Sequence, residues 1–600
     1  MIASTAPDQG FTEEQKSYLD GFLSGVRNRG VAFGDVEPSP VADSADESVK
    51  SSKLKLAKEE AIKAELDPLD AFPRLREDAK TNAFPSADNV FRFKWNGLFW
   101  LAPVHDAYMC RLRIPGGVLK TYQWRELASI ADDLASGFGQ ITTRNNLQLR
   151  LIQPKDTPEL MRRLVSVGLH SRGSGADNLR NFTANPTAGI CPHELIDVLP
   201  FINDLATTVM QSTYYYDLPR KFNISFDGGN TVGVAEDTND IGFRAVRAKR
   251  EIPQGHPLHG MIEPGGIYFR VLLGGVSGHQ EWAEDSGILC RPGEAVDLAL
   301  ALVRVYIENG NRGNRKKARM IYLLKAWGYQ RYVDETEVCL GHKLMRVSET
   351  DAGTILESPV RPTDVPHPHL GAFPQKQDGL NYLGVHVPVG IIETDRMRAL
   401  AEVADTFGSG ELRLTIFQSL IIPNIPDDKL EAAKAAVVEG GLNYRASLIR
   451  GGLAACTGNR YCKYSSADTK CHAVALADYL EERIELDQPL NIHVTGCAHS
   501  CAQHYIGDIG LLACKVERGG KSVEGFHVFV GGGFRDQKRF GRQLFKGVAT
   551  GEELQQKVLA LLRTYLDERQ GGERFQDFTV RHDIDELAKA VEAKLQDKAA

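Results

Sequence analysis

The sequence predicts an α+β fold built from α/β units, in two pseudo-symmetric halves that each hold a small unit followed by a larger one. Three observations support this. The chain has 600 residues, too many for one hydrophobic core. Residues 111–169 align with 384–442 without a gap. The similarity continues downstream with small shifts. Fused halves of this kind are expected to enclose one large site at their pseudo-twofold interface.

The gapless repeat is carried by turn, helix and strand residues alike. Each copy is expected to form a strand, a turn, a helix, a strand and a helix. Residues 140–152 alternate as a strand does, and 122–136 have the apolar spacing of a helix. The coinciding residues include Pro115/Pro388, Gly117/Gly390, Thr121/Thr394, Asp132/Asp405, Gly137/Gly410, Thr142/Thr415, Leu147/Leu420 and Leu169/Leu442.

Weaker matches extend the repeat into the larger units. Leu179-x3-Thr183 is aligned with Leu453-x3-Thr457, and the run 268–276 resembles 525–533. These matches predict the following boundaries: 1–90, an N-terminal extension of helix and linker; 91–170, the first small unit; 171–345, the first larger unit; 346–445, a linker and the second small unit; 446–600, the second larger unit with a C-terminal helix.

The extension is expected to hold a helix over 11–26, a polar linker over 34–56 and a charged surface helix over 58–66. The globular part is expected to begin near Phe91.

Composition excludes several classes of protein. The chain is 42% hydrophobic and 25% charged, with 71 basic and 78 acidic residues, a net charge of −7. This balance argues against attraction to nucleic acid or a membrane surface. No apolar run approaches the ~18 residues of a membrane helix. Ten cysteines in 600 residues are too few for a disulfide scaffold, and the N-terminus does not resemble a secretory signal. We therefore expect a cytoplasmic protein.

Four of the cysteines form two spaced pairs, Cys456-x5-Cys462 and Cys497-x3-Cys501. A [4Fe–4S] cluster held by four thiolates fits two such loops. Zinc is the first alternative, although x5 is a long spacing for a zinc pair. Unligated thiols are the third. We expect the other cysteines to be buried thiols (Cys110, Cys191, Cys290, Cys339 and Cys514), and Cys471 to lie on a helix as a non-ligand.

With the repeat and these two pairs, the sequence resembles the sirohaem- and [4Fe–4S]-containing nitrite and sulfite reductases over about residues 90–580. The resemblance implies ferredoxin-like small halves, each followed by a larger mixed α/β sirohaem and cluster domain. It also implies that the four paired cysteines hold the cluster, with Cys501 bridging to the sirohaem iron. An external donor, ferredoxin, is implied as well, and we find no GxGxxG in the context of a nucleotide-binding module.

The reduction of an oxyanion needs cations that bind oxygen and relay protons. Arg111, Arg180 and Lys221 lie in otherwise apolar or glycine-rich contexts and match the family's substrate-binding cations. Asn223 takes the fourth position: Lys-x-Asn is the nitrite-type pattern, and Lys-x-Lys the sulfite type. The resemblance assigns the sirohaem carboxylates to a further set, namely Thr142, Arg144, Gln148, Arg220 and Arg319.

Two features stay open. The basic run Arg312–Arg319 reads either as cofactor-binding, as a solvated face or as a docking patch for an acidic electron donor. The family's usual Pro-Asn between the last two ligands is Ala498-His499 here, which adds a titratable group beside the cluster.

The sequence therefore predicts a monomeric, cytoplasmic assimilatory nitrite reductase that takes electrons from ferredoxin and reduces nitrite to ammonia. The alternative on the same scaffold is a sulfite reductase. The alternative from another class is a non-catalytic zinc or iron–sulfur module. Absorption separates these classes, because sirohaem has Soret and red bands and a zinc module has neither.

Overall fold

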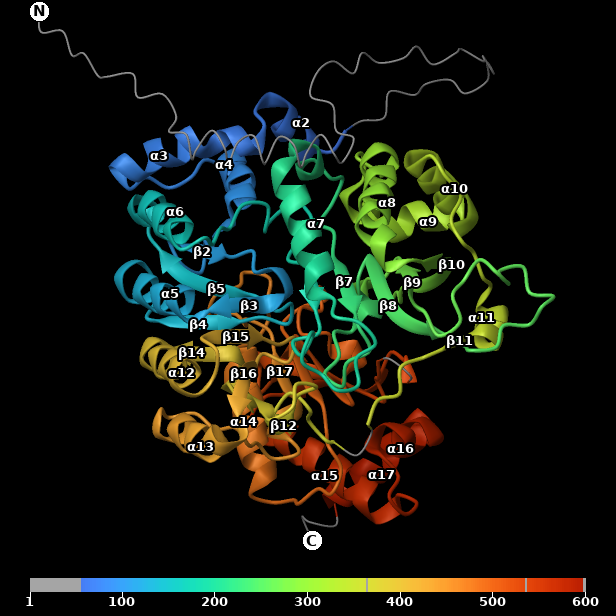
Figure 1. The fold of residues 1–600 in the computed structure, drawn as a ribbon. Helices are drawn as coiled ribbons and strands as arrows, with labels where there is room; N and C mark the ends of the chain where they lie inside the picture. The colour runs from blue at the N-terminus through green and yellow to red at the C-terminus, as the bar shows by residue number, and fades with distance from the viewer. Residues whose placement is uncertain (1–55, 363–364, 535–536, 597–600) are drawn as a thin grey trace, which may run out of the picture. The chain divides into compact units, whose positions relative to one another are not determined.

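The computed structural model describes residues 56–362, 365–534 and 537–596 (Figure 1). The helix predicted over 11–26, and nearly all of the linker over 34–56, lie outside these residues. The charged helix predicted over 58–66 is present as α2 (Lys58–Glu65). No helix in the described part of the chain is long and apolar enough to cross a membrane.

Each small unit is an antiparallel sheet of five strands, and one strand of each sheet comes from the other copy. The first sheet has the order β1 (Leu98–Trp100), β2 (Tyr108–Arg111), β5 (Leu147–Ile152), β4 (Phe138–Ile141), β14 (Ile391–Glu393). The second has the order β12 (Gly371–Pro374), β13 (Leu380–Val385), β16 (Leu420–Pro426), β15 (Glu411–Leu414), β3 (Val118–Lys120). The exchanged strands β3 and β14 are equivalent in the repeat, so the two small units form one domain.

Each copy also has two strands more than expected, one of them the exchanged β3 or β14. The predicted strand over 140–152 is a hairpin of β4 and β5, whose turn carries Thr142 and Arg144. The helix predicted over 122–136 is α5 (Thr121–Leu134), and its equivalent is α12 (Thr394–Phe407).

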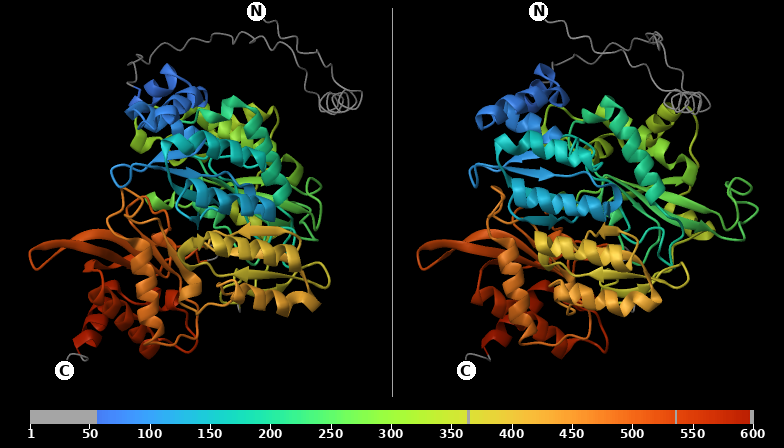
Figure 2. Two further views of the ribbon diagram at one scale, coloured as in Figure 1. Left: turned by 90° about the vertical axis from the view of Figure 1, so that its left-hand side faces the viewer. Right: turned by 60° about the vertical axis from the view of Figure 1, so that its left-hand side comes forward.

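The two equivalent helices pack against each other and share one hydrophobic core (Figure 2). Their ion pairs repeat the symmetry: Arg125 binds Asp405 at 2.5 Å, and the equivalent Arg398 binds Asp132 at 2.5 Å. Half-exposed pairs of this kind contribute little stability, about 0–1 kcal/mol each. Their main effect is to fix the register of α5 on α12.

Buried amides join the small units to the larger ones in the same symmetric way. The Asn145 side chain donates to the carbonyls of Leu414, at 2.8 Å, and Ala184, at 3.2 Å. The equivalent Gln418 donates to Ile141, at 3.2 Å, and Ala455, at 3.0 Å.

The two larger units share one topology. The first sheet has the order β10 (Glu284–Cys290), β9 (Ile267–Leu273), β8 (Ile241–Ala248), β7 (Ile224–Asp227), β6 (Thr183–Ala184), with β11 (Leu356–Glu357) added beside β8. The second has the order β17 (Leu453–Ala455), β18 (Ile492–Thr495), β19 (Ile509–Arg518), β20 (Lys521–Val530), β21 (Arg542–Ala549). In both, the first three strands along the chain are parallel and the last two antiparallel.

Strand pairing corrects one part of the sequence alignment. In the first larger unit, Thr183 pairs with Ser225, and Ser225 pairs with Gly242 on the next strand. In the second, Ala454 pairs with His493, and His493 pairs with Gly510. Thr183 is therefore equivalent to Ala454, three residues before the predicted Thr457. The predicted match of 268–276 with 525–533 is confirmed, because Leu273 and Val530 occupy the same register position.

Helices cover both large sheets, and each unit has its own core. The first has α7 (Leu199–Gln211), α8 (Ala295–Asn309), α9 (Met320–Trp327), α10 (Tyr329–Leu340) and α11 (Glu349–Ile355). The second has α14 (Thr469–Glu481), α15 (Glu552–Glu568), α16 (Phe575–Arg581) and α17 (Ile584–Gln596). The small units carry α6 (Thr157–Ser166) and α13 (Leu430–Glu439).

The packed body begins earlier than the predicted Phe91. Helix α3 (Phe72–Thr81) precedes Phe91, helix α4 (Ala87–Arg92) contains it, and Ala71 and Leu75 belong to the core of the small units. The sequence signal was weak here because polar residues surround these few apolar ones.

Candidate active site

Two loops of the second larger unit bring the four predicted cluster ligands together. Cys456 directly follows β17, and Cys497 lies two residues after β18. Because these strands are parallel neighbours, their carboxyl ends meet at one edge of the sheet. The Gly496 backbone N–H donates to the Cys456 Sγ at 3.1 Å. Such a contact stabilises negative charge on sulfur.

The thiols influence one another electrostatically. Cys501 as a residue is exposed, but desolvation of its thiol by the surrounding protein raises its pKa, and the nearby Cys456 and Cys462 raise it further. Burial likewise raises the pKa of Cys497 to about 11. His499 lies against this group, with its Nδ1 at 3.3 Å from the Cys497 Sγ. In the part of the chain that the structure describes, no three His, Cys, Asp or Glu side chains are arranged to hold a single metal ion.

The remaining cysteines lie elsewhere. Cys471 is exposed in the first turn of α14, on a helix as expected. Three of the five predicted buried thiols are buried, and two are only half-buried: Cys110, Cys191 and Cys290, against Cys339 and Cys514. Cys514 lies in β19, at one of the alternating positions that belong to the less covered face of the sheet. Cys339 lies in the last turn of α10.

The three predicted substrate cations converge on this edge from the first half. Arg111, at the end of β2, lies over the Phe99 ring at 4.6 Å. The Arg180 guanidinium donates to the carbonyls of Ser174 and Ala176, at 3.1 and 2.8 Å. Burial lowers the pKa of Arg180, and the charge of Arg111 lowers it further. The two guanidinium groups therefore lie close enough to repel each other.

Lys221 is the one of the three whose pKa falls close to neutrality. Burial, followed by the charge of Arg319, lowers the pKa of its ammonium to about 7, while the Cys501 thiolate opposes this shift. Arg111 and Lys221 in turn lower the pKa of Cys501. The cations of one half and the last cysteine of the other thus form one electrostatic unit. A group with a pKa near neutrality can both hold an anion and give up a proton.

Asn223 is buried and held by a carboxylate. Its backbone N–H donates to the Asp240 Oδ2 at 2.9 Å, and its side-chain amide does so at 3.4 Å. The buried Arg319 binds both oxygens of Asp240, at 2.8 Å each. The two predicted residues Asn223 and Arg319 are therefore linked through Asp240, which the sequence reading missed. An acidic residue directly before an apolar strand, as in Asn239-Asp240-Ile241, was the available signal.

The other predicted sirohaem residues lie around the same place. The Thr142 Oγ1 accepts from the Arg144 backbone at 3.2 Å in the turn between β4 and β5. The Arg144 guanidinium contacts Asn239, and burial lowers its pKa to about 10. Gln148 pairs across the sheet with Arg111. Arg220 is half-buried and also lowers the pKa of its neighbour Lys221.

Arg150 was also missed. It is fully buried, its guanidinium donates to Gln148 at 2.6 Å and to Thr457 at 2.9 Å, and burial lowers its pKa to about 9. The charges of Cys462 and Cys456 act in the opposite direction. The signal was a charged residue in the apolar strand LQLRLI, where the second copy has Pro423.

The cluster loop also touches the first half directly. The Thr143 hydroxyl donates to the Cys501 carbonyl at 2.8 Å, and the Gln503 amide donates to the Thr238 hydroxyl at 2.8 Å. A Cβ on Gly278 would lie 3.0 Å from the His499 carbonyl. The halves therefore meet at this loop, as the repeat predicts.

These residues fit an anionic cofactor and a small anion. Unlike the half-buried Arg220, which pairs with Asp177, four half-buried cations have no carboxylate within ion-pair distance among the described residues: Arg111, Arg144, Arg180 and Lys221. The Arg180 Nε is buried and has no hydrogen-bond partner among those residues. Enclosing unpaired charge costs free energy, so such groups need negative partners. The carboxylates of a tetrapyrrole and an oxyanion are suitable ones.

Comparisons with known proteins agree with this chemistry. A family model described as "Nitrite and sulphite reductase 4Fe-4S domain" matches residues 175–344 and 450–599. A second, described as "Nitrite/Sulfite reductase ferredoxin-like half domain", matches 103–167 and 373–440. Both match twice, in the order that the internal repeat predicts.

Whole-length relatives are of two kinds. The chain is 35% identical to a ferredoxin–nitrite reductase of Synechococcus elongatus, over 86% of this chain and 98% of the relative. It is 31% identical to a protein named sulfite reductase [ferredoxin] 1 of Mycolicibacterium paratuberculosis, over 88% and 95%. The solved structure of the Mycobacterium tuberculosis NirA protein aligns with a TM-score of 0.80 at 30% identity, over 90% of this chain and 98% of that one.

Proposed function

The chain belongs to the nitrite and sulphite reductase family, and from that premise we propose that it is a ferredoxin-dependent nitrite reductase that converts nitrite to ammonia. The family's cofactors are sirohaem and a [4Fe–4S] cluster. When bound, they would relay the electrons that ferredoxin donates and would supply an iron site for the anion. The proposal extends to a cytoplasmic monomer working in nitrate assimilation.

We assign the cluster to Cys456, Cys462, Cys497 and Cys501. Their loops follow neighbouring parallel strands, and the Gly496 N–H stabilises charge on the first of them. Cys501 is the ligand proposed to be shared with the sirohaem iron. Its backbone carbonyl is held by Thr143 of the other half, which supports a fixed position at the interface.

The sirohaem carboxylates are assigned to the residues that surround this cysteine from the first half. They are Thr142, Arg144, Gln148, Arg220 and Arg319. Arg319 is already bound by Asp240, so we expect it to orient that carboxylate and Asn223 as much as to meet the cofactor.

The single observation that carries the proposal is the unpaired cation group beside Cys501. Arg111 and Arg180 are fixed donors that would hold the substrate oxygens, since guanidinium stays charged at any working pH. Lys221, with its pKa lowered to about 7, would pass protons to those oxygens at neutral pH. Asn223 adds an amide without adding charge, which suits a monoanion.

Sulfite reduction is the second candidate, favoured by the mycobacterial relative. The test measures kcat/KM for nitrite and for sulfite with purified holoenzyme and reduced ferredoxin. We expect nitrite to be preferred and ammonia to be the product. Sulfide formation at equal or higher efficiency would contradict the proposal and assign the chain to sulfite.

A further inference from the structure

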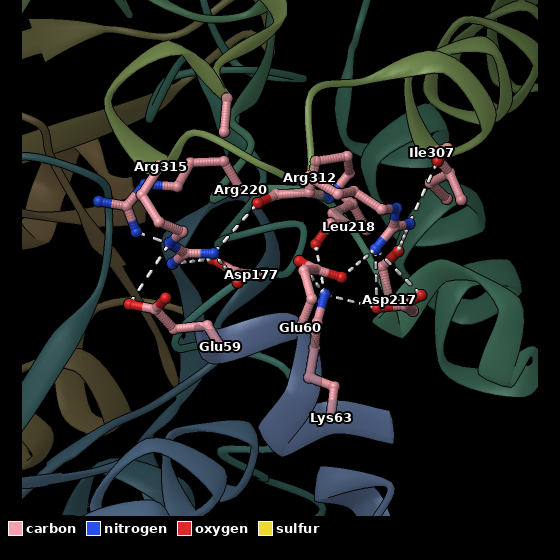
Figure 3. Close-up of polar contacts among 12 residues, drawn as sticks. Glu59, Glu60, Lys63, Asp177, Asp217, Leu218, Arg220, Ile307, Arg312 and Arg315 are labelled. Atoms are coloured by element: carbon pink, nitrogen blue, oxygen red, sulfur yellow. Dashed lines mark hydrogen bonds and ion pairs between the residues drawn. The ribbon is translucent and has the colours of Figure 1, made fainter. Parts of the chain in front are cut away.

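The basic run Arg312–Arg319 is divided: its arginines are half-buried or buried, whereas Lys316 and Lys317 are exposed. Figure 3 shows Arg312 and Arg315 turned toward acidic residues of α2 and of the first larger unit. Arg312 binds Glu60 at 2.8 Å, and Arg315 binds Asp177 at 2.5 and 2.9 Å. The interpretation of these two residues as a solvated or docking face is therefore wrong. Their charges are used inside the molecule.

Arg315 connects the two segments that carry substrate cations. Its guanidinium binds both oxygens of Asp177, which is fully buried and lies three residues before Arg180. The same group donates to the Pro219 carbonyl at 3.2 Å, two residues before Lys221. One side chain thus bridges the segment of Arg180 and that of Lys221.

Helix α2 holds the other side of this bridge. Lys63 binds Asp217 at 2.6 Å and donates to the Leu218 carbonyl at 3.2 Å, so it fixes the start of the segment that leads to Lys221. Glu60 binds Arg312, and Glu59 lies 3.6 Å from Arg315. The helix therefore contacts both the basic loop and the segment before Lys221 (Figure 3).

The cations held in this way repel one another. The charge of Arg180 lowers the pKa of Lys221, and Arg220 does the same. Without restraint, like charges that repel each other in this way would move apart into solvent. Asp177 counters this because it lies 3.7 Å from Arg220 and favours the charged form of Arg180.

We propose that α2, Arg312 and Arg315 form a strap that sets the separation of the anion-binding cations Arg180 and Lys221. Arg315 acts as a positioning residue through Asp177 and the Pro219 carbonyl. Helix α2, from the segment that sequence reading left without a role, supports it. This inference rests on the proposed function, because it names the site that the strap serves.

The main test removes the bridge without leaving a buried charge, in the double variant Asp177→Asn/Arg315→Gln. Replacing both partners avoids the penalty of an unpaired carboxylate. We expect the Kd for nitrite, read from the Soret shift of oxidised holoenzyme, and the KM to rise about tenfold with little change in kcat, as for a misplaced binding group. Carbon monoxide binding to the reduced enzyme, which needs no oxygen contacts, is expected to be unchanged.

Two further variants grade the effect. Glu59→Gln/Glu60→Gln loosens only the helix and is expected to raise the Kd for nitrite by about threefold. Arg304→Gln breaks the exposed Arg304–Glu308 pair on α8 and serves as the control with an unchanged Kd. An unchanged Kd for nitrite in the double variant would overturn the proposal. Joint loss of nitrite binding, carbon monoxide binding and sirohaem would also overturn it, in favour of a purely structural role.

Failure of the proposed function can be distinguished from failure of the strap proposal. If the wild-type holoenzyme reduces sulfite and not nitrite, the same titrations are made with sulfite, and the strap is judged on that anion.

Discussion

The two larger units have the same strand order and the same connections, yet they contribute opposite charges to one site. At the edge where the second unit ends its parallel strands in Cys456 and Cys497, the first brings Arg180 and Lys221. An Asn–Asp pair occurs at the same position in both: Asn223 with Asp240, and Asn491 with Asp508. Among the residues that the structure describes, Asp240 binds an arginine, Arg319, and Asp508 has no such ion pair.

The difference shows how a duplicated scaffold can be divided between two tasks. The sulfur ligands lie among small residues, where backbone N–H groups can approach them, as Gly496 does. Anion binding needs cations that keep their charge free for the ligand, and here Asp240 and Asp177 bind the neighbouring Arg319 and Arg315.

The largest effect is expected where the halves meet. Cys501→Ser should lower nitrite turnover by at least about a hundredfold, beyond the 10–100-fold typical of outer-shell losses, because the proposed shared ligand is removed. Cys471→Ser, on exposed α14, is the matched control and should retain full turnover. Steady-state assays with reduced ferredoxin, together with the absorption spectrum, measure both. Full activity of Cys501→Ser would refute the shared ligand.

The equivalent aspartates should respond to the same substitution with opposite signs. Asp240→Asn leaves the buried Arg319 without its charge partner and should destabilise the protein by about 3–5 kcal/mol. Burial raises the pKa of Asp508 to about 6, so the folded protein binds an extra proton between about pH 4 and 6. The wild type therefore loses stability as pH rises through that window, by roughly 2–3 kcal/mol.

Asp508→Asn lacks that loss and should be more stable than wild type at pH 7.5, with a smaller gain at pH 5. Thermal melting of both variants at the two pH values gives the comparison. Equal destabilisation by both substitutions would show that the aspartates are not differentiated.

The smallest effect concerns substrate choice. Asn223→Lys adds an ammonium beside Lys221, but Asp240 can pair with it and offset part of the added charge. We expect the ratio of sulfite to nitrite kcat/KM to rise about fivefold, within the range of a single altered contact. Asn491→Lys, at the equivalent position beside Asp508, is the control and should leave the ratio unchanged. An unchanged ratio in Asn223→Lys would remove this residue as the discriminator.

Much of the fold followed from the repeat, because glycines and apolar residues at fixed spacing encode turns and packed faces locally. Gly117 and Gly390 illustrate this: both have φ near +75°, and a Cβ on either would meet a backbone oxygen of the other copy within 2.8 Å. The exchange of β3 and β14 had no such signal. These three-residue strands pair with the edge strands β15 and β4 of the other copy, which the packing of α5 on α12 brings next to them.

The sequence by itself determined the two halves, the pairs of cysteines and the cations that match the family, because these depend on residue type and spacing. Only the tertiary structure decided the partner of each charge. Arg319 and Asp240 are far apart in the chain, as are Arg315 and Asp177, and these arginines of the basic run are turned inward for that reason. Electrostatic interactions depend on distance in space, which a linear sequence does not contain.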